Sequence, residues 1–182
     1  SCRLMDRPLR PLFPKGFYND VSVVATVMSV DPDCETDIMA LIGSSVAIAT
    51  SDIPWEGPTG SVRVGRIDGN FVINPDLAQR EVSDINLTVA GTEEAIMMVE
   101  AGADEVPEGV MLDAIFYAHE EIKKIVGFIN EIVAEVGKPK MDINLVKAPE
   151  DLEEAVREFA IDVVEKGIKK GAKAVISWIF KV

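Results

Sequence analysis

Three arginines near the start of the chain have the clearest potential for chemistry. Arg3, Arg7 and Arg10 lie in the stretch CRLMDRPLRPLFP, and spacings of four and three residues place them on one face of a short helix. A guanidinium group binds phosphate oxygens through two parallel hydrogen bonds, so this face predicts a site for a polyanion. The alternative is a solvated helix face whose arginines pair with Asp6 and balance nearby acidic residues.

The overall charge restricts where such a polyanion could bind. The 182 residues carry a formal net charge of −13, which should repel nucleic acid over most of the surface. Any phosphate binding must therefore be local. Hydrophobic residues make up 48 % and charged residues 27 % of the chain, which is typical of a folded soluble protein.

The cysteines and the single histidine argue against a soft-metal centre. Cys2 and Cys34 have no CxxC spacing, which predicts neither a disulfide framework nor a zinc site and favours a reducing, cytoplasmic setting. His119 has no neighbouring base or nucleophile and is interpreted as a packing or surface residue. The sequence shows neither a signal peptide nor an apolar run of about 18 residues, so we expect no membrane contact.

The elements that must position these residues follow from periodicity and turn signals. A short helix is predicted at 3–12, cut short by Pro8 and Pro11. The other expected elements are a buried central strand at 20–30, a helix at 37–50, a hairpin of 61–67 and 71–75, strands at 84–91 and 95–106, and helices at 110–136 and 150–166. Gly167 and Gly171 are expected to break the last stretch. The order predicts an α+β, two-layer fold with a mixed sheet.

Five segments together resemble a known family. They are CRLMDRPLRPLFPKGF, DIMALIGSSVAI, IPWEGPTGSVRVG, LTVAGTEEAIMMVE and MLDAIFYAHEEI, and in this order they resemble the first RNase PH-like repeat of the polynucleotide phosphorylases. The resemblance implies an RNase PH-like fold, related to the second domain of ribosomal protein S5. It divides the chain into a partial first RNase PH-like domain at 1–138, a linker at 139–149 and the start of a helical domain at 150–182.

The resemblance also implies an activity for a larger enzyme. That enzyme degrades single-stranded RNA from its 3′ end with inorganic phosphate as co-substrate and magnesium as metal, in a homotrimeric ring that can join RNA-degradation complexes. The expected setting is cytoplasmic mRNA breakdown, with no DNA or membrane partner. This chain is expected to lack the first half of the first repeat, the second repeat and both RNA-binding domains.

The same resemblance predicts that this chain is not the catalytic half. Where the catalytic repeat has serines that hold phosphate, this sequence has Glu35, Thr36 and Asp37, and their carboxylates would repel an anion. Where it has two metal-binding aspartates, this sequence has Ala78 and Asp84. We therefore expect no catalytic residue and no metal ligand here, and no phosphorolysis by the isolated chain.

The remaining site residues are the arginines. Arg3, Arg7, Arg10 and, through the stretch GPTGSVRVG, Arg63 match family arginines that face the substrate path, so they are the predicted RNA- and phosphate-binding residues. The alternative is a structural or oligomerisation module without RNA contact. Because strands are expected to be missing, uncovered apolar surface should cause self-association or association with the missing part.

Overall fold

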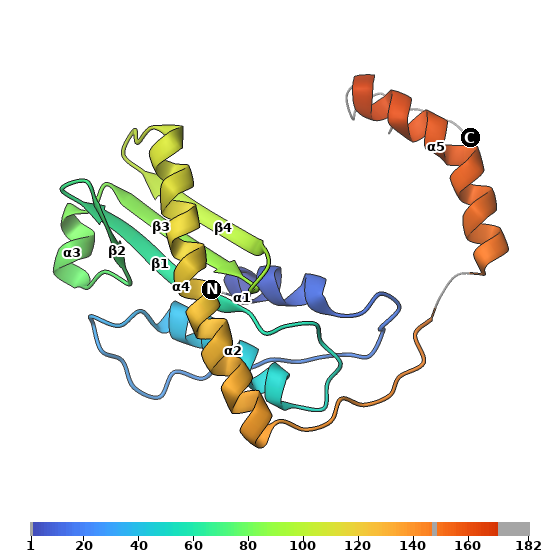
Figure 1. Ribbon diagram of the computed structural model, residues 1–182, viewed down its shortest axis with the longest axis horizontal. Coiled ribbons are helices and arrows are strands. Elements are labelled where there is room, and N and C mark those ends of the chain that lie inside the picture. The colour runs from blue at the N-terminus through green and yellow to red at the C-terminus, as the bar shows by residue number, and fades with distance from the viewer. Residues whose placement is uncertain (1, 147–148, 171–182) are drawn as a thin grey trace. The chain divides into compact units, whose positions relative to one another are not determined.

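The structure is a computed structural model that describes residues 2–146 and 149–170 (Figure 1). Its contacts divide the chain into two compact units, Ser1–Asn144 and Leu145–Val182. This division falls within the stretch 139–149 that the sequence predicts to be a linker, while the domain boundaries themselves stay predictions. The stretch 171–182, with the expected break at Gly171, lies outside the described residues.

An antiparallel sheet forms the centre of the first unit. Its strands are β1 (Gly60–Ile67), β2 (Asn70–Ile73), β3 (Ile85–Gly91) and β4 (Ile96–Ala103), in the order β2-β1-β3-β4. Asp68 and Gly69 join β1 to β2 with φ values of 49° and 81°, as a tight hairpin turn requires. The predicted hairpin and the two later strands are confirmed. The α+β class is confirmed as well, although the four described strands are all antiparallel rather than mixed in direction.

One long helix covers one face of this sheet. The helix α4 (Glu108–Val136) runs across the strands in Figure 1. Its Ala114, Ala118 and Ile122 pack with Val62 of β1 and Leu87 of β3 in a fully buried core. Gly60 allows the close approach, because a Cβ atom there would lie 3.0 Å from the Ile122 carbonyl oxygen. Apolar residues at helical spacing thus produce the helix that the sequence predicts.

Two helices before the sheet form a second group. They are α1 (Cys2–Leu9), which a 3₁₀ turn at Arg10–Leu12 (η1) continues, and α2 (Thr36–Thr50). The helix α1 includes Pro8 and ends at Leu9, and Pro11 disfavours α-helical backbone at Arg10, where the 3₁₀ turn begins. A short helix, α3 (Leu77–Val82), follows β2 and begins with a capping box between Asp76 and Gln79.

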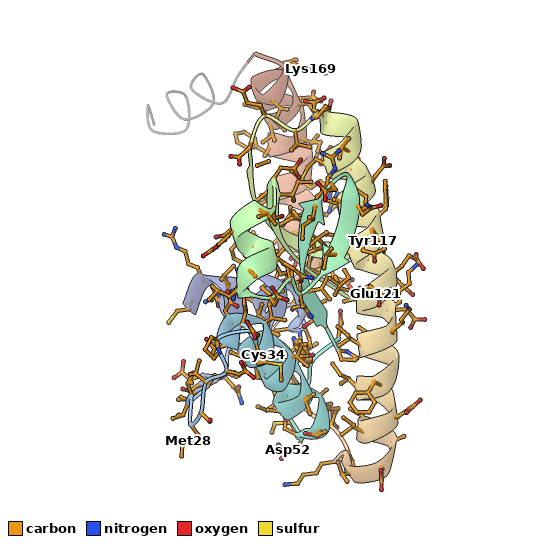
Figure 2. The ribbon with its side chains drawn as sticks, turned by 90° about the vertical axis from the view of Figure 1, so that its left-hand side faces the viewer. Met28, Cys34, Asp52, Tyr117, Glu121 and Lys169 are labelled. Carbon is orange, nitrogen blue, oxygen red and sulfur yellow. The ribbon has the colours of Figure 1, made fainter. Side chains whose placement is uncertain are left out.

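The expected buried strand at 20–30 is wrong. The described residues 20–30 form neither helix nor strand, and most of them are exposed, with Val24 at 82 % and Met28 at 90 %. Figure 2 shows Met28 far out on this segment and Cys34 near the start of α2. A strand needs a hydrogen-bonding neighbour, and this segment pairs with none of the four described strands. The apolar sequence of the segment alone does not show whether such a neighbour exists.

The second unit contains one described helix, α5 (Glu150–Lys170). The helix continues through Gly167, so the expected break at that glycine is wrong. A single glycine inside a helix costs only about 1 kcal/mol relative to alanine, which the neighbouring helical residues offset. In the described ranges, no helix combines the length and the apolar character that crossing a membrane would require.

Candidate functional site

The predicted basic face is present and exposed. Arg3, Arg7 and Arg10 lie on α1 and η1, and all three are exposed, whereas Pro8 and Leu9 between them are buried. The helix thus turns its apolar side inward and its arginines outward. Leu9 joins a core cluster with Ile48, Ala49, Trp55 and Ile129, which fixes the helix against α2 and α4. The guanidinium groups are therefore carried by a packed element and reach solvent.

Carboxylates engage two of these arginines at the surface. Arg10 Nε donates to both oxygens of Asp6, at 2.9 and 3.0 Å, and these bonds raise the pKa of Arg10 above its ordinary value. Arg7 Nη1 lies 3.8 Å from Glu100 Oε2 on β4. No carboxylate of the described residues is within ion-pair distance of Arg3. Exposed pairs of this kind contribute little to stability, so a polyanion can compete for these arginines.

Arg63 occupies a different environment. Its Nη1 donates to Glu35 Oε1, and its Nη2 lies 2.9 Å from Asp37 Oδ2. Arg80, on α3, also donates through Nη1 to Glu35 Oε1. The Arg63 and Glu35 side chains are only 16 % and 12 % exposed. We name Glu35, Asp37, Arg63 and Arg80 the carboxylate–arginine cluster.

The structure links Arg63 to the basic face through the sheet. Arg63 pairs with Thr88 of β3, and Thr88 pairs with Glu100 of β4, so the three side chains share one face. Glu100 is the partner of Arg7. The four predicted site residues differ in exposure: Arg3, Arg7 and Arg10 are exposed, whereas the Arg63 side chain is largely buried in the carboxylate–arginine cluster. Its role toward RNA stays a prediction.

Asp84, which the resemblance matches to a metal-binding aspartate of the catalytic repeat, has a structural partner. Asp84 Oδ2 lies 3.0 Å from Arg66 Nη1, and the backbone amide of Asp84 donates to the Arg66 carbonyl oxygen at 3.1 Å. Within the described ranges, no group of three or more His, Cys, Asp or Glu side chains is arranged to hold a metal ion. The structure therefore assigns Asp84 to an ion pair.

Three polar residues have roles that sequence reasoning only partly found. Ser45 is fully buried and its Oγ accepts a 2.9 Å hydrogen bond from the Thr59 amide, which ties α2 to the loop before β1. His119 Nε2 lies 3.1 Å from the Thr92 carbonyl oxygen, in agreement with a packing role. Arg80 was missed as a partner of Glu35, because 45 residues separate the two and no local pattern connects them.

Two family models match consecutive parts of the chain. The model described as "3′ exoribonuclease family, domain 1" matches residues 1–54, and the model described as "3′ exoribonuclease family, domain 2" matches residues 57–121. Together the two matches cover more than half of the chain. The first includes α1 and α2, and the second includes the whole sheet and the first half of α4.

Two curated relatives are similar to most of this chain. The chain is 65 % identical over 169 residues to the polyribonucleotide nucleotidyltransferase of Clostridioides difficile (strain 630), covering 93 % of this chain and 24 % of that protein. It is 57 % identical over 173 residues to the protein of that name from Heliobacterium modesticaldum (strain ATCC 51547 / Ice1), covering 95 % and 24 %. The chain thus spans about a quarter of the length of these relatives.

Proposed function

Because the chain belongs to the 3′ exoribonuclease family, we propose that it is part of a polyribonucleotide nucleotidyltransferase that degrades RNA from the 3′ end with inorganic phosphate. In this proposal the region guides RNA and does not carry the chemistry. The observation that carries it is the exposed face of Arg3, Arg7 and Arg10 on a helix whose other side is buried in the core. Guanidinium groups fixed in this way are suited to backbone phosphates.

The chemistry is assigned to another part of the whole enzyme. The carboxylates of Glu35 and Asp37 stand at positions that match the phosphate-binding serines of the catalytic repeat, and they already neutralise Arg63 and Arg80. A magnesium ion requires several oxygen ligands, and Asp84 is engaged with Arg66. We therefore place magnesium and phosphate turnover in the second RNase PH-like repeat of the whole protein, outside this chain.

The proposal also covers the oligomeric state and the cellular location of the enzyme. The exposed apolar segment 20–30 supports a scaffold role, and we propose a homotrimeric enzyme of cytoplasmic mRNA degradation that can join other degradation proteins. A second candidate is a structural module that makes no RNA contact. The ion pairs of Arg7 with Glu100 and of Arg10 with Asp6 favour this reading, because they occupy two of the three arginines.

RNA binding at low ionic strength tests the proposal. We compare the 182-residue chain with the R3A/R7A/R10A variant, using fluorescence anisotropy of a labelled single-stranded RNA. The charge-matched control is K123A/K124A/K138A, which removes three lysines from exposed or half-buried positions in and beyond α4. We expect the arginine variant alone to lose at least about tenfold in affinity, equivalent to about 1.4 kcal/mol. Equal binding by all three proteins overturns the RNA-guiding role and favours the structural module.

A further inference from the structure

Two guanidinium groups from different elements converge on one carboxylate. Arg63 comes from β1 and Arg80 from α3, and each donates through Nη1 to the same oxygen, Glu35 Oε1. Asp37 supplies a second carboxylate, 2.9 Å from Arg63 Nη2. The Arg80 side chain is 26 % exposed, so like the other members of the cluster it is largely shielded from water. Such a pair of arginines is the arrangement that binds an oxyanion.

Other groups hold the Arg63 backbone and the Arg80 guanidinium independently of Glu35. The backbone amide of Arg63 donates to Asn74 Oδ1 at 2.9 Å, and the amide of Asn74 donates back to the Arg63 carbonyl oxygen at 2.7 Å. Arg80 Nη2 donates to the Pro32 carbonyl oxygen at 2.8 Å, and its Nε donates to the Asp76 carbonyl oxygen at 3.3 Å. The Arg80 guanidinium should therefore remain in position when the carboxylates lose their charge. Among the described residues, the Arg63 guanidinium is bound only by Glu35 and Asp37, so the bonds to Asn74 fix its backbone and not its side chain.

Within the described residues, the ion pairs of the carboxylate–arginine cluster leave two of its polar atoms without a hydrogen-bond partner. In the described part of the chain, Arg63 Nε and Glu35 Oε2 are buried and have no hydrogen-bond partner. A cavity of about 100 Å³ adjoins Glu35, between Ile38 and Asn74; Asp33 also lines it, and neither arginine does. A water molecule needs only about 10–15 Å³ of such space, so the cavity has room for a larger polar group.

We infer that Glu35 and Asp37 are the built-in anion of an oxyanion site and keep inorganic phosphate out of it. Two carboxylates cancel the charges of two arginines in the intact cluster. Neutral amides at both acidic positions would leave two positive charges in a shielded place. That charge matches the phosphate dianion. The inference goes beyond the proposed function, because it does not depend on RNA binding.

The test is whether removing the carboxylates creates phosphate binding. We compare wild type with E35Q/D37N by calorimetric titration of inorganic phosphate at about pH 8, where the dianion dominates. Sodium chloride keeps the ionic strength constant. We expect one saturable site in the variant, with an affinity at least about tenfold higher than any binding by wild type. A folded variant that binds phosphate no better than wild type overturns the inference.

A further variant tests where phosphate binds, and a further measurement applies if E35Q/D37N does not fold. E35Q/D37N/R80Q removes one of the two guanidinium groups and should lose the new phosphate binding. If binding persists there, it comes from another basic region, and the inference fails. If E35Q/D37N unfolds from repulsion between its arginines, phosphate should restore the circular dichroism of the folded chain where equal ionic strength of chloride does not. Failure of phosphate to restore it also overturns the inference.

Discussion

The indole Nε1 of Trp55 donates a 2.9 Å hydrogen bond to the carbonyl oxygen of Leu9, the last residue of α1. Trp55 is only 7 % exposed, and 46 residues separate it from Leu9. The next amide, that of Glu56, donates to the Leu12 carbonyl oxygen at 2.8 Å. The loop after α2 therefore holds the backbone of the arginine-bearing segment at two points, which fixes the direction of its exposed face.

Replacing Trp55 by phenylalanine should weaken this connection. Trp55→Phe keeps an aromatic ring but leaves the buried Leu9 carbonyl oxygen without its donor. Such a loss costs about 1–3 kcal/mol. Urea denaturation should show this decrease in the free energy of unfolding, and RNA affinity should fall because the arginines are less well positioned. An unchanged denaturation midpoint would show that the hydrogen bond contributes nothing measurable.

Gly57 provides a second test of the same contact. A Cβ atom at Gly57 would lie 2.2 Å from Cζ3 of the Trp55 ring, so Gly57→Ala must displace the indole. We expect a loss of about 1–3 kcal/mol, as for other overpacked sites. Gly43→Ala is the matched control: this exposed helical glycine has no atom within 4 Å of an added Cβ, and the change should stabilise the chain by about 0.5–1 kcal/mol. Opposite shifts of the melting temperature distinguish the two sites.

The regular elements were predictable because their signals are local. The Asp68-Gly69 turn and the helical spacing of Ala114, Ala118 and Ile122 each depend on residues that are close in sequence. The state of 20–30 depends on whether a pairing strand is present, which its own residues do not encode. The candidate site likewise has a part that could be predicted from local sequence and a part that could not. The exposed face of Arg3, Arg7 and Arg10 follows from helical spacing, whereas Arg63 of β1, Glu35 just before α2 and Arg80 of α3 meet only through the packing of these elements.

The exposed segment at 20–30 should drive association of the chain. Val24 and Met28 are almost fully exposed, and they line a surface groove together with one side of α2. V24D/M28D should reduce self-association in sedimentation velocity, because it removes apolar surface and adds charge. S22D/S29D adds the same charge in the same segment without removing apolar side chains, so it should retain more of the association. A wild-type chain that sediments as a 19.8 kDa monomer at all concentrations would contradict this prediction.

The salt dependence of RNA binding tests most directly whether Arg3, Arg7 and Arg10 hold RNA phosphates. For single-stranded nucleic acid, each phosphate contact contributes about 0.7 to the slope of log affinity against log salt concentration. Loss of three contacts in R3A/R7A/R10A should therefore reduce the magnitude of that slope by about 2, while K123A/K124A/K138A keeps the wild-type slope. Equal slopes for the arginine variant and wild type would contradict the account.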